Sequence, residues 1–254
     1  MDIIKKYVQS LEQKAIPQLS VNCVIFSFHE KMLKVVVNKV TIEDTTMTLL
    51  PGGFVMQTED LTVAVERIVR ESTGLEKILF SQFAVFGDAS RSFGGDAAYK
   101  KLKTTENKKL FDWISKRFIS ICYLALVDFN KIELKPTQFL EGAEWLSVSE
   151  GKILSLDHTE ILRSAHAFLA KELPYAPIES NLLPSRFTLP ELHALIEAIL
   201  DRSIDRPNFR RKILKSNQIV KVGQNSSGKR RPADLYTFKH GRKTNLIDDY
   251  KLGF

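Results

Sequence analysis

The segment from Gly52 to Leu75, GGFVMQTEDLTVAVERIVRESTGL, constrains the fold of this chain more than any other stretch. Its paired glycines, Gly52 and Gly53, predict a turn. Apolar residues then recur at helical spacing, at Leu61, Val65, Ile68 and Val69. Gly74 ends this pattern, since glycine readily adopts the left-handed conformation that closes a helix. We therefore predict a glycine turn and then a helix from about Asp60 to Ser72.

Strand-like runs rich in β-branched residues lie on both sides of this helix. Ser20–Phe28 and Met32–Val40 are separated by a short polar turn, which predicts a hairpin. Ile78–Gly87 and the apolar run after Arg117 predict further strands. Residues 92–109 between these runs are rich in glycine and lysine, which favours a surface loop or a short exposed helix. Strands interleaved with one helix predict an α/β/α sandwich that ends near residue 156.

The remainder of the chain predicts a winged helix-turn-helix. A helix is expected at Asp157–Leu173, followed by the extended segment PIESNLLP. The next helix, Thr188–Leu200, starts with a capping box, and Asp205 caps a third helix, RPNFRRKILKS. The strand-like runs NQIVKVG and ADLYTFK follow, on either side of a polar tip. This order is typical of a winged helix, so we predict domains at 1–156 and 157–254.

Positive charge is concentrated in the second predicted domain. The whole chain carries a net charge of +7. The stretch from Arg202 to Lys243 carries 13 Lys or Arg against two acids, a net charge of +11, which leaves −4 for the rest. A slightly acidic body with a strongly basic end indicates a polyanionic partner. The alternative is a charge run that is merely solvated.

The third predicted helix offers one face to a core and the other to DNA. Phe209 and Ile213 share the apolar face. The opposite face carries residue types that contact base edges or phosphates, namely Asn208, Arg211, Lys212 and Lys215. A basic tip between Gly228 and Pro232 is expected to contact the minor groove or backbone, through Lys229, Arg230 and Arg231. Together these residues predict double-stranded DNA as a partner.

Gly53, Glu59, Arg67, Val69, Glu71, Gly74 and Leu75 match the pattern G-x5-E-x7-R-E-U-x-E-E-x-G-U, in which U is apolar. This pattern resembles the box of the Nudix family, whose members hydrolyse nucleoside diphosphates linked to another moiety. The resemblance implies a Nudix-like fold for the first domain. Ile68 and Ser72 stand where the family has glutamates.

The two missing glutamates weaken the expected metal site. Positions 68, 71 and 72 share one helical face, and three carboxylates there would hold Mg²⁺ against a pyrophosphate. Glu71 alone is a poor anchor for Mg²⁺, which retains its own water strongly. Glu71 also lies four residues after Arg67, so that pair has a structural interpretation as a salt bridge. We expect a pocket that binds without cleaving, with no catalytic residue, metal or cofactor.

The segment FGDASR, Phe86–Arg91, is similar to the FGD…R segment that lines the ligand site in the regulatory branch of the Nudix family. The resemblance implies four candidate effector-binding residues: Gly53, Glu71, Asp88 and Arg91. The alternative is that Asp88 and Arg91 only fix a loop. The basic stretch that follows in that branch is replaced here by the insertion at 92–109.

The segment from Arg186 to Val220, RFTLPELHALIEAILDRSIDRPNFRRKILKSNQIV, resembles the C-terminal domain of Nudix-related transcriptional regulators. In those proteins the Nudix domain binds a metabolite and a homodimer of winged helices binds an operator. Sugar-catabolism regulators of the Bacteroides type have a box that lacks the same two glutamates. The implied effector is a pentose, a sugar phosphate or an ADP-ribose-like compound. The alternatives are a Mg²⁺-dependent hydrolase of ADP-ribose-like compounds and, without any particular sign, a protein–protein adaptor.

The remaining features predict a cytoplasmic protein. Cys23 and Cys122 lie in apolar runs and are expected to be buried, reduced thiols. The start of the chain lacks the apolar core of a signal peptide. The longest apolar stretch, Phe118–Phe129, is too short to span a membrane and predicts a buried strand. Core-edge or surface roles, not metal binding, are expected for His158, His166 and His193.

Overall fold

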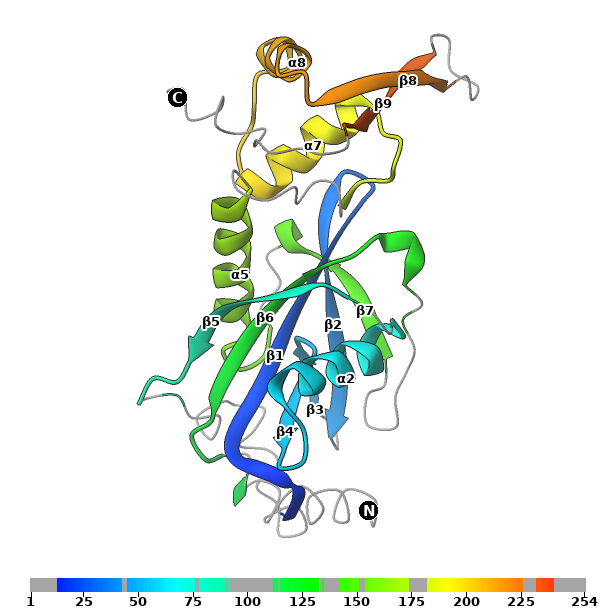
Figure 1. The fold of residues 1–254 in the computed structure, drawn as a ribbon. Coiled ribbons are helices and arrows are strands. Elements are labelled where there is room, and N and C mark those ends of the chain that lie inside the picture. The colour runs from blue at the N-terminus through cyan, green and yellow to red at the C-terminus, as the bar shows by residue number, and fades with distance from the viewer. Residues whose placement is uncertain are drawn as a thin grey trace.

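The computed structural model describes residues 13–42, 45–75, 78–89, 91, 112–113, 115–132, 134, 142–150, 154–173, 182–225 and 232–239. The predicted hairpin is present: β1 (Ala15–His29) and β2 (Met32–Ile42) pair antiparallel (Figure 1). Glu30 and Lys31 form its turn with φ values of 50° and 63°. Two successive residues with positive φ are typical of the turn that matches the twist of paired strands.

The hairpin is the centre of a mixed sheet. Its main strand order is β3-β2-β1-β6-β5, with β4 also paired to β1 and β7 to β2. The pairing of β1 with β6 is parallel, and the other pairings are antiparallel. The other strands are β3 (Thr45–Leu49), β4 (Gly52–Met56), β5 (Phe80–Phe86), β6 (Ile119–Leu126) and β7 (Gly142–Ser147).

The expected glycine turn is wrong, because Gly52 and Gly53 begin strand β4 and pair with β1. A Cβ atom on Gly52 would stand 2.5 Å from Asn22 Oδ1 and 2.9 Å from the carbonyl oxygen of Val21. Glycine is therefore required here for the close approach of two strands, not for a reversal of the chain.

The predicted glycine-flanked helix is confirmed as α2 (Leu61–Thr73), which begins and ends one residue later than expected. Gly74 ends it in the left-handed conformation, and its N–H donates to the carbonyl of Arg70 at 2.8 Å. The apolar stripe of α2 covers one face of the sheet, where it joins Val21, Cys23 and Ile25 of β1 in a buried cluster.

The alternate residues of β1 point to the other face of the sheet. Val24 and Phe26 join a second cluster with α5 (His158–Glu172), so the sheet lies between α2 and α5. This is the predicted α/β/α sandwich. Two short 3₁₀ segments, η2 (Phe129–Lys131) and η3 (Val148–Glu150), border it. None of the helices among the described residues is long and apolar enough to cross a membrane.

The winged helix is also confirmed. It comprises α7 (Leu189–Leu200), α8 (Arg206–Lys215), β8 (Ile219–Asn225) and β9 (Ala233–Phe238). The capping box of Thr188 and Glu191 is formed, and Asp205 Oδ1 accepts from the N–H of Asn208 at 2.9 Å. An isolated antiparallel β-bridge between Phe187 and Tyr236 joins the segment before α7 to the two-stranded sheet. Residues 177–181 of the predicted extended segment lie outside the described residues, and 182–184 form no strand.

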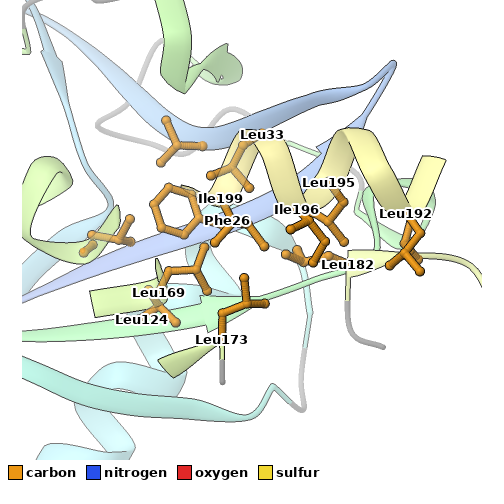
Figure 2. Packing of buried hydrophobic residues seen from close by; sticks show 14 of the residues in the cluster. Phe26, Leu33, Leu124, Leu169, Leu173, Leu182, Leu192, Leu195, Ile196 and Ile199 are labelled. Atoms are coloured by element: carbon orange, nitrogen blue, oxygen red, sulfur yellow. The ribbon is translucent and has the colours of Figure 1, made fainter. Parts of the chain in front are cut away.

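The sandwich and the winged helix share one hydrophobic core. Figure 2 shows Phe26 of β1 and Leu33 of β2 beside Ile199 of α7. All three are buried, with at most 3 % of each residue exposed. Helix α5 contacts β1 and β5 on one side and α7 on the other. A boundary at residue 157 stays a prediction, since α5 packs on both parts.

This shared core predicts that a cavity in α7 destabilises the sandwich. The only two tryptophans, Trp113 and Trp145, lie in the sandwich part of the chain and report its unfolding. Ile199→Ala should lower the free energy of unfolding by about 2–5 kcal/mol, as for other buried aliphatic truncations. Urea titration followed by tryptophan fluorescence measures this. Leu214→Ala, on α8 and 44 % exposed, is the matched control and should change little. A tryptophan transition that Ile199→Ala leaves unmoved would contradict the shared core.

Candidate effector pocket and nucleic-acid interface

The loop between β4 and α2 is locked by a bidentate ion pair. Arg67 Nη2 donates to Glu59 Oε1 at 2.6 Å, and Arg67 Nε donates to Glu59 Oε2 at 3.0 Å. Arg67 also donates to the carbonyl of Phe54 at 2.9 Å. The hydrogen bonds that Arg67 donates to Glu59 lower the pKa of Glu59 below its usual value. Glu71 Oε1 is 3.7 Å from Arg67 Nη1, so the predicted Arg67–Glu71 pair exists but is the weaker one.

The two positions that lack the glutamates of the Nudix box, Ile68 and Ser72, are buried. Ile68 is 2 % exposed, and a Cβ on Gly53 would lie 3.3 Å from its side chain. Ser72 is 3 % exposed and accepts from Asn38 Nδ2 at 3.5 Å. Glu71, the glutamate that the box retains between them, is by contrast exposed over 54 % of its side chain. No group of three or more His, Cys, Asp or Glu that could hold a metal ion occurs in the described part of the chain.

Arg91, a predicted effector residue, is bound by the protein itself. Its Nε donates to Asp157 Oδ2 at 2.5 Å, and its Nη1 donates to the carbonyl of Phe118 at 2.7 Å. Its backbone N–H donates to the carbonyl of Asp88 at 2.9 Å. Arg91 thus ties the loop after β5 to the start of β6 and of α5. This geometry favours the interpretation that Arg91 fixes a loop, and a role in effector binding stays a prediction.

His158 belongs to this buried group, with 6 % of the residue exposed. A core-edge or surface role is expected for it from the sequence. Its Nδ1 accepts from the N–H of Leu50 at 2.8 Å. Burial lowers the pKa of His158 to about 4, against the favourable charge of Asp157. The ring is therefore neutral at physiological pH, which suits an acceptor. The contact joins residues 108 apart in sequence, so local patterns gave no signal.

Burial also determines the protonation state of the two cysteines. Cys23 and Cys122 are free and buried, as expected. Loss of hydration raises the pKa of Cys122 to about 12 and raises the pKa of Cys23 as well. Both are protonated core thiols near neutral pH, and neither is a nucleophile.

His158 predicts a specific loss of stability in mild acid. The unfolded chain takes up a proton as the pH falls below 6.5, while the folded ring stays neutral until about pH 4. The free energy of unfolding therefore falls as the pH drops through this window, by about 3 kcal/mol at most. His158→Gln should flatten this part of the profile, whatever its own stability. Urea titrations from pH 7 to pH 4 measure the slope. An equal slope in both proteins would contradict the buried neutral ring.

The predicted DNA-reading helix is α8, and its two faces are as expected. Phe209 and Ile213 are buried in the shared core. Arg211 and Lys215 are exposed, and Asn208 and Lys212 are half-buried. Arg211 Nη2 donates to Asn208 Oδ1 at 2.9 Å, so these two side chains are held together. All four side chains lie on α8, and their role in DNA binding stays a prediction.

The wing strands carry further polar contacts that the sequence did not indicate. Asp234 on β9 accepts from Lys221 Nζ at 2.7 Å and from Gln224 Nε2 at 2.9 Å, both on β8. These bonds lower the pKa of Asp234. Lys229, Arg230 and Arg231 lie outside the described residues.

Comparisons with known proteins agree with this architecture. Residues 180–238 match the model of the NrtR DNA-binding winged helix domain. Over 243 residues the chain is 27 % identical to an ADPR responsive transcriptional repressor, NtrR, of Acinetobacter baylyi; this covers 94 % of this chain and 86 % of the relative.

Solved structures with the same architecture include NrtR of Shewanella oneidensis. It matches with a TM-score of 0.61 and 25 % identity, over 87 % of this chain and 94 % of that chain. The same Shewanella protein complexed with a 27mer DNA matches with a TM-score of 0.63 and 24 % identity, over the same shares of each chain. A MutT/nudix family protein of Enterococcus faecalis has a TM-score of 0.61 at 17 % identity, over 93 % of each chain.

Proposed function

We propose that this chain, which is a Nudix-fused winged-helix transcription regulator of the NrtR type, is a repressor whose operator binding is controlled by ADP-ribose or a close analogue. The observation that carries the proposal is the span of the similarity. It covers 94 % of this chain, and so both the sandwich and the winged helix, in a relative described as an ADPR responsive repressor.

The DNA-binding part of the proposal rests on α8. Arg211 and Lys215 stand exposed on the helix face opposite Phe209 and Ile213. Arginine recognises guanine edges in a bidentate manner and lysine contacts phosphates, so this face suits a major groove. We place Asn208 and Lys212 at the same interface, and Lys229, Arg230 and Arg231 at the wing tip. A homodimer would present two such helices to two half-sites about one helical turn apart.

The sensing part of the proposal rests on the altered box. The pair of Glu59 and Arg67 keeps the frame of a phosphate-binding loop. Ile68 has replaced a carboxylate with buried apolar surface, and Ser72 forms a hydrogen bond with Asn38. A frame with one exposed carboxylate, Glu71, favours binding of a diphosphate without its metal-assisted hydrolysis.

Removing two cations from α8 tests the DNA interface. Arg211→Ala/Lys215→Ala should lower the affinity for an operator duplex by about 100-fold, since each contact of this kind is worth about 1–3 kcal/mol. The dependence of the affinity on salt should also become less steep. Fluorescence anisotropy at several salt concentrations measures both. Arg70→Ala/Lys171→Ala removes the same charge from α2 and α5 and should bind nearly as wild type. Equal losses in the two variants would mean that only net charge matters.

Calorimetry with ADP-ribose, with and without Mg²⁺, tests the sensor. We expect saturable binding, an intact ligand afterwards, and a lower affinity of the loaded protein for its operator. Pentoses and sugar phosphates serve as competing candidates, and tighter binding of one of these would replace ADP-ribose as the effector. The rival function is a Mg²⁺-dependent hydrolase of ADP-ribose-like compounds. Turnover with Mg²⁺ or Mn²⁺ that Glu71→Gln abolishes would establish that rival.

A further inference from the structure

A large cavity lies where the sandwich meets the winged helix. It has a volume of about 880 Å³, and it is lined by the tip of the β1–β2 hairpin, η3, α5, α7 and the connection from α7 to α8. Figure 1 shows the hairpin, α5 and α7 converging at this level of the molecule. Binding pockets for small molecules commonly measure about 300–1,000 Å³. We call it the inter-domain cavity, and it has room for a nucleotide.

The inter-domain cavity collects positive charge that forms no ion pair with another described residue. The side chains of Lys31, Arg202 and Arg206 line it, and none of them takes part in an ion pair or hydrogen bond within the described part of the chain. They come from three separate places: the hairpin turn, the end of α7 and the first residue of α8. Gathering three like charges around one opening is unfavourable, and an anion placed between them relieves the repulsion.

The other charged residues of the cavity change this balance only slightly. Arg163 is paired with Glu160 at 2.6 Å. Glu197 accepts from the N–H of Ile204 at 2.8 Å and lies 3.1 Å from His193 Nδ1. Asp201 is left as the one carboxylate without an ion pair among the described lining residues. Counted over all the charged lining residues, four cationic side chains lie beside two carboxylates, and this net charge of +2 favours a doubly charged anion.

The walls also provide an apolar surface beside these charges. Leu33 and Leu162 are 3 % and 8 % exposed, and both line the cavity together with Ala198. An uncharged part of a ligand would pack there while its anionic part meets the arginines. Small-molecule sites typically combine such an apolar wall with a few convergent polar groups.

We propose that the inter-domain cavity is a second binding site, separate from the altered Nudix box, for a phosphorylated small molecule of nucleotide size. Lys31, Arg202 and Arg206 hold its phosphate groups, and the wall around Leu33 and Leu162 receives the remainder. The ligand bridges the hairpin of the sandwich and the first residue of the recognition helix. Its occupancy therefore changes operator affinity, provided that it binds the DNA-competent and DNA-incompetent arrangements differently.

Hydrogen–deuterium exchange of the full chain with millimolar ADP tests this site. We expect slower exchange at residues 29–33 and 200–207 in the wild-type protein, and at least a tenfold weaker ADP effect there in Arg202→Ala/Arg206→Ala. Both arginines are exposed, so the variant should melt at the wild-type temperature. Arg70→Ala/Lys171→Ala is the control and should respond to ADP at 29–33 and 200–207 as the wild type does.

Two outcomes would overturn the proposal. One is protection by ADP that is confined to residues 52–75, or equal in all three proteins at the cavity segments. The other is a loss of operator affinity in Arg202→Ala/Arg206→Ala while ADP protection is unchanged, which would assign these arginines to DNA phosphates. The sensor proposal fails separately, if ADP-ribose neither binds nor protects residues 52–75.

Discussion

The rest of the structure depends on one contact, the packing of the β1–β2 hairpin against α7. Phe26 and Leu33, from the sandwich, belong to the same hydrophobic cluster as Ile196 and Ile199 of α7 (Figure 2). Interfaces between domains of one chain are often polar and allow relative motion. Here an apolar core crosses the interface beside the inter-domain cavity, so a displacement of the hairpin would be transmitted to α7, which contacts α8.

The altered box keeps the hydrogen-bonded loop between β4 and α2 without carboxylates at positions 68 and 72. The loop is held by hydrogen bonds that Arg67 donates to Glu59 and to the carbonyl of Phe54, and these bonds do not require a metal. The two positions without carboxylates face inward: Ile68 packs under Gly53, and Ser72 forms a hydrogen bond with Asn38. A carboxylate at position 68 would now enter a cluster of valines and alanines, where an unpaired charge is strongly disfavoured.

Local features of the fold could be predicted from sequence, and long-range ones could not. The end of α2 at Gly74 and the capping box of Thr188 and Glu191 depend on neighbours within four residues. The two faces of α8 follow from helical spacing alone. The strand role of Gly52 depends on Asn22, and the bonds of Arg91 depend on Asp157, 66 residues away. The inter-domain cavity draws its cations from turns and helix ends, where no periodic pattern marks them.

The shared core has a consequence for the engineering of this protein. A chimera that grafts α7, α8 and the wing onto another sensor would expose the leucines and isoleucines that now face the hairpin, among them Leu195 and Ile199. Such a patch promotes aggregation unless the recipient supplies a matching apolar surface. A transplantable unit must therefore carry the hairpin tip and α5 with it, whereas the exposed face of α8, with Arg211 and Lys215, can be altered without exposing this core.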